Sequence, residues 1–587
     1  MIPQPIPQPP PAQEPTQPAL LVAWGHFAQS RGLLDQLATV PLAQKTVHHS
    51  PAAQLLTCFV GLRAGNESLV DLSHGPAPIE HDAALAAAWD LPAFPEASSV
   101  RRTLAAADPT TPQALQTVLT TLRPPFLDRA LADLGTRAAP LRFDLDLMGR
   151  SVTRHSHSYP DAAFGYRDGA LHLGYQLALV CLHTDLYARQ WLAAVQHPGN
   201  TPSAACLPDL VAAAEARVHL HPRRRPDLVA QRLAPLEAAV AVAHAQTTPY
   251  TALATAASPQ EDTLLAQIAA AHAAGWQADP PTHAALARQI TTRQRRLGHV
   301  RQQGAAAVTR SERAAAHASG LAATRPALQA WLDQLAQENA AAGPAPRCIV
   351  RVDAGFSSGA NLRYLLELGY EVETRANNSA VARALRQRVT PTTAWTTVGP
   401  GTTMAVWPDY YATGCPYPLW AGLEQWAMED GPCYTALLRS HPDPATAMVD
   451  PRAWFAAYNG RQTIEAGNKQ AQGVCHLQHF WSRSAIGMQI QVALTVFAAN
   501  FVHWAAEWVT ARTVMGPPTA HAAATLAPVR GAVRVAANSL ATVERYDGQV
   551  LVRFGALSSL VGWVICVAGP LVVQLGLPLF GVACATA

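Results

Sequence analysis

Apolar and polar residues alternate at every position from 141 to 147. The alternation places the leucine and phenylalanine side chains on one face and Asp144 and Asp146 on the other, which predicts a half-buried strand. Two further strand-like runs follow at 171–182 and 187–199. Together the three runs predict a three-strand meander.

The pattern of strands and helices continues on both sides of a long helical region. A helix that starts at Thr201-Pro202 follows the meander. After residue 345, the stretch RCIVRVDAGF predicts a strand that ends at Asp353, a helix closed by Gly369 comes next, and 370–378 predicts another strand. This order indicates an α/β fold.

The remaining segments differ in composition and divide the chain. We expect a disordered Pro-rich leader at 1–18, a helical N-terminal domain at 19–138 that binds DNA, an α/β core at 139–212 and 346–510, a helical insertion at 213–345, a small β-rich insertion at 390–445 and a C-terminal region at 511–587.

Several helical features leave two interpretations open. In the N-terminal domain, Ser98 or Ser99 is a suitable N-cap, and Arg101 and Arg102 would present cations to DNA phosphates unless the segment is an ordinary helical hairpin. The basic patches of the helical insertion are either solvated helix surface or contacts to a DNA backbone.

Two long apolar segments also need an explanation. The run 485–509 predicts a buried helix in which Asn500 and His503 require partners. The uncharged stretch from residue 555 to the end is long enough to span a bilayer, but Gly569-Pro570 interrupts it. We expect a buried terminal element there, with a membrane anchor as the alternative.

Composition narrows the class of protein. A chain of 587 residues and 62.5 kDa requires several domains. The nine cysteines form no CxxC pair and the start of the chain has no secretory signal pattern, so we expect a reduced, cytoplasmic protein. A net charge of +3 leaves nucleic-acid binding open, because a local basic groove matters more than the total.

Three acidic residues are candidates for chemistry. Asp146 and Asp353 are each expected at the end of a strand, which is where ligand sites of open α/β sheets lie. Two such carboxylates and a third can hold divalent metal ions, although each taken singly also fits a strand-end cap or a salt bridge. Glu465 supplies the third if its helix face points inward.

The stretch YNGRQTIEAGNKQ gives Glu465 its context. On one continuous helix, Tyr458, Arg461, Glu465 and Lys469 would lie within an arc of about 80°. That face could combine a metal-binding carboxylate with cations for a phosphate backbone. The same spacing also fits surface ion pairs, and Asn459-Gly460 disfavours a continuous helix.

These motifs together carry a resemblance to a known family. FDLDLMGR, the D-x-G-F after the central strand and the Y-x2-R-x3-E stretch occur in order, and they resemble the DDE transposases of bacterial insertion sequences, in the insertion sequence 4 superfamily. The resemblance covers roughly 138–210 and 345–510. It implies a ribonuclease H-like catalytic core of the α/β class, carrying the helical domain and the two insertions.

The resemblance also implies roles for individual residues. Asp146, Asp353 and Glu465 would be the catalytic, metal-binding triad for Mg²⁺, with Mn²⁺ as a possible substitute, and Asp144 is an alternative to Asp146. Tyr458, Arg461 and Lys469 would bind DNA. The family usually has a lysine seven residues after the glutamate, where this chain has Gln472.

The resemblance therefore predicts a DNA transposase that binds the terminal inverted repeats of an insertion sequence and catalyses metal-dependent strand cleavage and strand transfer. Its partners would be double-stranded DNA and a second copy of the chain in a DNA-bound homodimer, in the cytoplasm at the nucleoid. One alternative is a DNA-binding protein descended from a transposase that no longer cuts DNA. Another is a membrane-associated protein anchored by its C-terminal segment, which we consider less favoured.

Overall fold

The computed structural model describes residues 12–42, 48–440 apart from 168, 188, 277, 278, 344 and 430, 450–516 apart from 475, and 532–570 apart from 534, 537, 547, 557 and 559. The chain forms two compact units. The larger unit comprises Met1–His221, Pro346–Arg363 and Tyr370–Ala587, and the smaller one comprises Pro222–Ala345 and Tyr364–Gly369.

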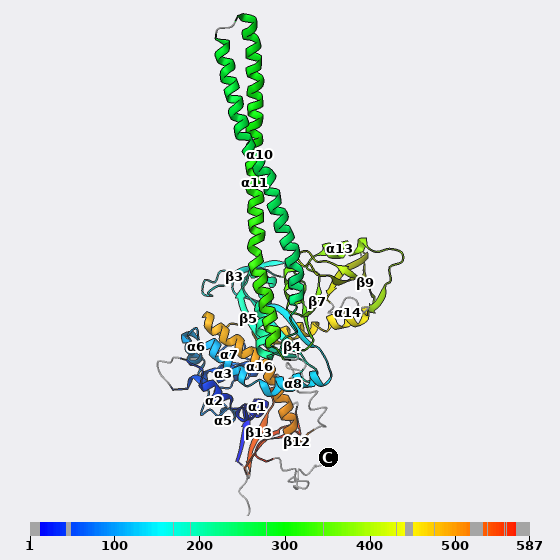
Figure 1. The fold of residues 1–587 in the computed structure, drawn as a ribbon. Coiled ribbons are helices and arrows are strands. Elements are labelled where there is room, and N and C mark those ends of the chain that lie inside the picture. The colour runs from blue at the N-terminus through cyan, green and yellow to red at the C-terminus, as the bar shows by residue number, and fades with distance from the viewer. Residues whose placement is uncertain are drawn as a thin grey trace, which may run out of the picture. The chain divides into compact units, whose positions relative to one another are not determined.

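A ten-stranded mixed sheet runs through the larger unit (Figure 1). The strand order is β3-β4-β2-β6-β7-β11-β10-β9-β8, and β5 also pairs with β4. The strands are β2 (Leu141–Ser151), β3 (Ala163–Arg167), β4 (Ala170–His183), β5 (Arg189–Pro198), β6 (Cys348–Val352), β7 (Glu371–Arg375), β8 (Thr396–Gly399), β9 (Thr402–Tyr410), β10 (Leu419–Met428) and β11 (Gly431–Arg439).

The parallel strands β2, β6 and β7 lie between two antiparallel parts of the sheet. β2 pairs antiparallel with β4 and parallel with β6, and β6 pairs parallel with β7. The predicted meander therefore exists as β2, β4 and β5. β3, a short strand that forms a hairpin with β4, was not among the predicted strands. Its large apolar side chains, Phe164 and Tyr166, do alternate, but both are exposed.

β2 is buried on both faces, so the prediction of a half-buried strand is wrong. Successive side chains alternate between faces, which places Met148 on the same face as Asp144 and Asp146. Met148 packs in a cluster with side chains of the helices that cover this face, including Ile464 and Val492. The polar face of β2 is therefore inside the protein, where its charges need partners.

Helices surround the sheet and form a separate helical layer. They are α1 (Ala19–Ser30), α2 (Leu33–Ala38), α3 (Pro51–Ala64), α4 (Asp71–His74), α5 (Ala83–Ala88), α6 (Ala97–Ala106), α7 (Thr111–Thr121), α8 (Pro124–Thr136), α9 (Ser203–Val218), α12 (Gly359–Glu367), α13 (Ser379–Gln387), α14 (Pro451–Asn459), α15 (Gln462–Gly473) and α16 (Ala485–Arg512). The N-cap of α6 is Glu96, so neither Ser98 nor Ser99 has the predicted capping position.

α16 forms the centre of the helical layer. Among the described residues it is the one helix long and apolar enough to cross a membrane, and 78% of that apolar window is buried inside the protein. Asn500 has the partner that its burial requires: its side chain accepts from the Trp191 backbone N–H and donates to the Trp191 carbonyl, both at 2.8 Å. Burial lowers the pKa of His503 to about 4.

The two ends of the chain meet in a second, five-stranded sheet of order β1-β13-β14-β15-β12. It contains β1 (Ala12–Thr16), β12 (Thr513–Met515), β13 (Ala541–Tyr546), β14 (Gln549–Phe554) and β15 (Val564–Ala568). The predicted disordered leader is therefore wrong for 12–16, because β13 supplies an edge that satisfies its backbone. The uncharged C-terminal stretch contains the buried strand β15, and residues 571–587 lie outside the described residues.

The smaller unit is a helical hairpin of α10 (Pro226–Gly275) and α11 (Pro280–Ala341), which run side by side (Figure 1). One antiparallel register holds over much of its length, with Glu237 facing Arg325, Thr251 facing Ser311 and Glu261 facing Arg301.

The base of the hairpin is clamped. Arg224 and Asn339 exchange two hydrogen bonds of 2.8 and 3.0 Å, and the buried Arg224 guanidinium pairs with Glu338 at 2.6 Å. Part of the basic patch at 221–227 is thus structural, because Arg224 is engaged inside the unit.

Candidate active site

The structure brings the three predicted acids together. Asp353 directly follows β6, as expected, whereas Asp146 lies inside β2, which continues to Ser151. The parallel register ends with Asp144 opposite Arg351, so two positions further along Asp146 is level with Asp353. Asp146 was expected at the end of its own strand. It instead lies beside the point where the shorter neighbouring strand β6 ends.

A single guanidinium faces all three carboxylates. Nη2 of Arg461 lies 3.5 Å from Asp146 Oδ1 and 3.9 Å from Asp353 Oδ2, and Nη1 lies 3.4 Å from Glu465 Oε1. The Arg461 side chain is 7% exposed, whereas those of Asp353 and Glu465 are 40% and 53% exposed. The site thus combines one buried guanidinium with two carboxylates that are open to solvent.

The acids repel one another despite this cation. Burial and, to a smaller extent, the nearby Asp353 and Glu465 carboxylates raise the pKa of Asp146 to about 6, although Arg461 opposes the rise. One guanidinium therefore leaves an excess of negative charge, and such an excess is what a bound cation would neutralise.

The donor set fits a hard divalent cation. Three carboxylates, on β2, directly after β6 and on α15, supply oxygen ligands, and the exposure of Asp353 and Glu465 leaves room for the waters that Mg²⁺ retains. A backbone group also orients the Asp353 carboxylate, because its Oδ1 accepts the Gly355 N–H at 2.9 Å. Asp146, Asp353 and Glu465 are the residues that could hold such an ion.

Asn468 is a site residue that the sequence reasoning missed. It lies on α15, one turn after Glu465, and its Nδ2 donates to Asp146 Oδ2 at 2.8 Å. Its side chain is 8% exposed, and Oδ1 is buried without a hydrogen-bond partner. The spacing of three residues from Glu465 on one helix was the available signal, since such positions share a face.

Asp144 cannot replace Asp146 in this arrangement. Its carboxylate forms a two-pronged ion pair with Arg351, with N–O distances of 2.5 and 2.7 Å, and both side chains are at most 3% exposed. Burial raises the pKa of Asp144, and Arg351 opposes the rise. Arg351 also donates to the Ala457 carbonyl at 2.6 Å, so the pair ties β2 to α14.

Tyr458 does not share a helix face with Glu465, so that expectation is wrong. Gly460 ends α14, and α15 begins at Gln462, which breaks the continuous helix on which the shared arc depended. The Tyr458 ring packs with Met404 and Trp454 in an apolar cluster and is 8% exposed. Burial raises the pKa of its hydroxyl.

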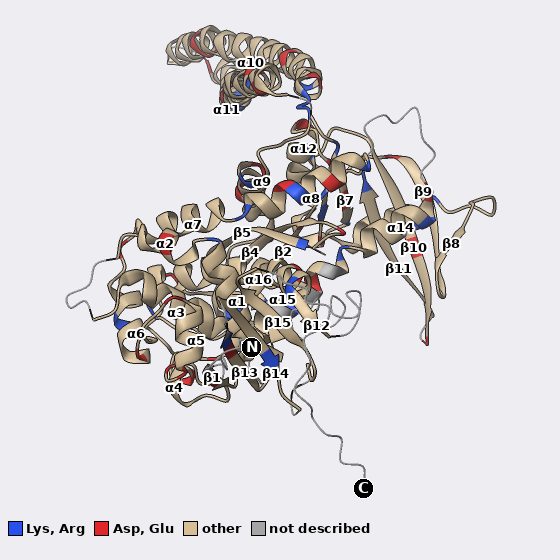
Figure 2. Cartoon of the chain, turned by 90° about the horizontal axis from the view of Figure 1, so that it is seen from below, with Lys and Arg blue, Asp and Glu red and all other residues tan. Residues whose placement is uncertain are grey.

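A groove of about 770 Å³ opens beside Glu465. Lys469 and Gln472 line it from α15, and Arg167 lines it from β3. Figure 2 shows acidic and basic residues next to each other on and beside α15. Lys469 and the position that differs from the family pattern, Gln472, therefore face the same groove.

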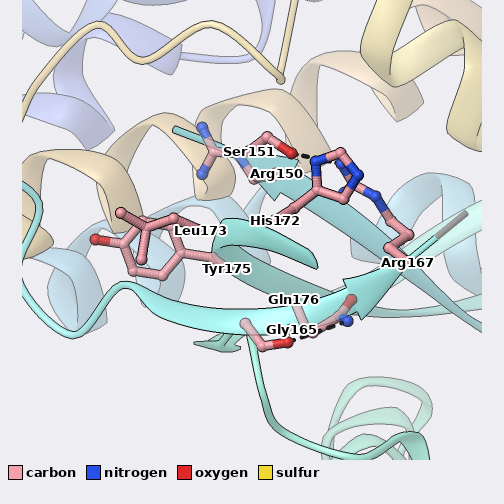
Figure 3. A pocket seen from close by; sticks show the side chains of 10 residues that line it. Arg150, Ser151, Gly165, Arg167, His172, Leu173, Tyr175 and Gln176 are labelled. Carbon is pink, nitrogen blue, oxygen red and sulfur yellow. Dashed lines mark hydrogen bonds between the residues drawn. The ribbon is translucent and has the colours of Figure 1, made fainter. Parts of the chain in front are cut away.

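A smaller pocket lies at the far end of β2 (Figure 3), and Ser151 and Arg167 line both this pocket and the groove. Arg167 reaches across Gly149 and donates to the Ser151 hydroxyl. A Cβ atom at Gly149 would lie 1.6 Å from Arg167 Nη1, so the Arg167 side chain would have to move if residue 149 carried a Cβ atom. The buried Arg150 guanidinium donates to the Leu477 carbonyl at 2.8 Å, which attaches β2 to the segment after α15.

Comparisons with known proteins add a distant structural similarity. No family model matches the chain, and no curated protein sequence matches it. Among solved structures, the chain is similar to the piggyBac transposase in a synaptic complex with hairpin DNA, with 10% sequence identity and a TM-score of 0.35 over 89% of this chain and 84% of that chain. The resemblance to the insertion sequence 4 superfamily stays a prediction from the motifs.

Proposed function

We propose that the chain is a metal-dependent DNA transposase whose active site is formed by Asp146, Asp353 and Glu465. The observation that carries the proposal is the convergence of these acids, from three distant parts of the chain, on the single guanidinium of Arg461. Isolated strand-end caps or surface pairs would have no reason to converge in this way.

The sheet supports a ribonuclease H-like core. Strands β5, β4 and β2 are antiparallel neighbours, and β6 and β7 then continue parallel to β2. Asp146 lies on β2, Asp353 directly follows the adjacent parallel strand β6, and Glu465 lies on a helix that packs against β2. This is the order of strand, strand and helix that the three sequence motifs require.

The proposed chemistry is phosphoryl transfer on double-stranded DNA. A water oxygen attacks the scissile phosphorus and the bond from phosphorus to the 3′ oxygen breaks, which leaves a 3′-hydroxyl and a 5′-phosphate. The 3′-hydroxyl then attacks a target phosphorus, and the bond from that phosphorus to the target's 3′ oxygen breaks, so the target strand leaves with a free 3′-hydroxyl. When bound, Mg²⁺ or Mn²⁺ would activate the attacking oxygen and stabilise the leaving one.

The residues of the chain have separate roles in this proposal. Asp146, Asp353 and Glu465 hold the ion, Asn468 fixes the orientation of Asp146, and Lys469 contacts DNA phosphates in the groove. The buried Arg461 guanidinium balances part of the charge of the acids, and Tyr458 holds α14 in place by packing against Met404. A DNA-bound homodimer in the cytoplasm completes the proposal.

The test is an assay of DNA cleavage and strand transfer. The purified chain is incubated with Mg²⁺ and a DNA fragment that carries the sequences flanking its gene, and nicked and joined products are separated on gels. We expect products with the unmodified chain and none with Glu465→Gln or Asp353→Asn.

Glu429→Gln, which changes an exposed glutamate in the turn between β10 and β11, is the matched control and should keep full activity. If Glu465→Gln cleaves as well as the unmodified chain, the proposed active site is wrong. Sequence-specific binding without any Mg²⁺-dependent product would instead select the DNA-binding protein that no longer cuts.

A further inference from the structure

A second group of potential metal ligands lies away from the three acids. Glu67 follows α3, and His476 and His479 follow α15. One ligand atom from each of the three side chains lies within 4.8 Å of the others, and His476 Nδ1 is 3.7 Å from Glu67 Oε1. Ligand atoms about 2.0–2.1 Å from a tetrahedral Zn²⁺ lie roughly 3.4 Å from one another, so a small side-chain movement would close the site.

The backbone of this segment is shaped to present both imidazoles. His476 has a φ of +46°, a conformation that L-residues rarely adopt. The His479 N–H donates to the His476 carbonyl at 2.8 Å, which closes a tight turn and leaves the two rings 5.8 Å apart. An unfavourable backbone conformation that directs two ligands to one point is a reason to look for function.

The surroundings of the turn hold it in place. The Trp481 indole donates to the Glu67 carbonyl at 3.0 Å, and Gln491 Nε2 donates to the His479 carbonyl at 2.8 Å. A hydrogen bond with the Gly65 backbone also reaches His476. The bonds from Trp481 and Gln491 fix the backbone from which the Glu67 and His479 side chains project.

A neighbouring cavity offers space for the remaining ligand. It has a volume of about 240 Å³, and Asn66 and His476 are among the residues that line it. Asn66 is 2% exposed, and its side-chain nitrogen is buried without a hydrogen-bond partner. A water in this cavity would accept that hydrogen bond beside His476, and a water bound to the ion would complete a four-coordinate site.

We propose that Glu67, His476 and His479 bind one divalent transition-metal ion of the Zn²⁺ class. Two imidazole nitrogens and one carboxylate suit Zn²⁺, whereas the all-oxygen acid cluster suits Mg²⁺. The ion would fasten the turn after α15 to the loop between α3 and α4, and thereby fix the end of the groove that His479 lines.

The experiment measures zinc binding to the full-length chain, purified without a histidine tag and stripped of metal. Isothermal titration with Zn²⁺ should show one tight site per chain, and Co²⁺ should give the visible absorption of a tetrahedral complex. His479→Gln and Glu67→Gln should each weaken zinc binding by at least about tenfold. Loss of a residue that only hydrogen-bonds to a metal ligand already lowers metal affinity by about that factor, and loss of the ligand itself should lower it at least as much.

Two controls separate this site from others. The double variant His155→Gln/His157→Gln removes two exposed imidazoles elsewhere and should bind zinc unchanged. Glu465→Gln should also keep the zinc site, which distinguishes it from the proposed active site. Unchanged zinc affinity in both His479→Gln and Glu67→Gln, with circular dichroism showing folded chains, would overturn the proposal.

Discussion

Two aspartates that are two residues apart on β2 should have opposite effects on stability when each is changed to asparagine. Asp144 and Arg351 form a buried pair with contacts of 2.5 and 2.7 Å. Asp144→Asn removes the carboxylate and leaves the guanidinium charge buried without compensation. Loss of one partner from such a pair costs about 3–5 kcal/mol of unfolding free energy.

Asp146 is in the reverse situation, because its ionised form is repelled by its neighbours. Burial and the two nearby acids raise its pKa from 3.8 to about 6. With about 1.4 kcal/mol for each pKa unit, ionisation of Asp146 at pH 7.5 costs on the order of 3 kcal/mol. Asp146→Asn removes the charge and keeps an acceptor for Asn468, so it should stabilise the chain by about 1–3 kcal/mol.

The sign of the pH dependence follows from the raised pKa. Protonated Asp146 contributes to the unfolding free energy because the folded chain binds this proton more tightly than the unfolded chain does. The contribution is fully present below the unfolded pKa of 3.8 and is lost as the pH rises through the folded pKa of about 6. The advantage of Asp146→Asn over the unmodified chain should therefore be largest at pH 7.5 and shrink at pH 5. Excess Mg²⁺ at pH 7.5 should stabilise the unmodified chain more than this variant.

Urea unfolding followed by tryptophan fluorescence checks both effects. The midpoint should fall for Asp144→Asn and rise for Asp146→Asn, and Asp409→Asn, at an exposed pair with Arg388, should change it little. If Asp146→Asn destabilises the chain as much as Asp144→Asn, the reasoning that separates a structural from a metal-binding aspartate is refuted.

Three further changes test other parts of the structure. Asn468→Ala should lower the cleavage rate on the same DNA substrate about 10- to 100-fold, because the Asp146 carboxylate loses the hydrogen bond that orients it. A rate within twofold of that of the unmodified chain would contradict this positioning role. His503, with its pKa lowered from 6.5 to about 4, should make the chain lose about 3 kcal/mol of stability as the pH falls from 6.5 to 4, and His503→Gln should flatten this slope in urea titrations. Replacing residues 252–310 by a short Gly-Ser turn that joins Thr251 to Ser311 should change the melting temperature of the larger unit by only a few degrees, because the rest of the hairpin keeps its register. Loss of the helical circular dichroism signal of the whole chain would contradict this expectation.

Much of the core could be predicted from local sequence patterns. The strands around Asp146 and Asp353, the helix with Glu465 and the long helical insertion all have patterns that depend on nearby residues alone. The grouping of the three acids came from their order along the chain and from the resemblance, and the structure places them around one point.

The features that could not be predicted depend on distant partners. Whether Asp144 is paired depends on the register between β2 and β6, which brings Arg351 opposite to it. The position of Tyr458 depended on whether Gly460 would end a helix. The strand at 12–16 forms because β13, more than 500 residues further along, offers an edge. Local periodicity carries no information about any of these contacts.

The helical hairpin makes the chain divisible. A backbone break between α10 and α11 would leave two polypeptides, with Asp146 on the first and Asp353 and Glu465 on the second. Each would also carry one helix of the hairpin and one half of the clamp between Arg224 and Asn339. Neither fragment could assemble the acid cluster alone, so metal-dependent activity in a mixture would signal that complementary fragments had associated. The insertion that separates the two halves of the core in sequence is also the element through which a split core could be rebuilt.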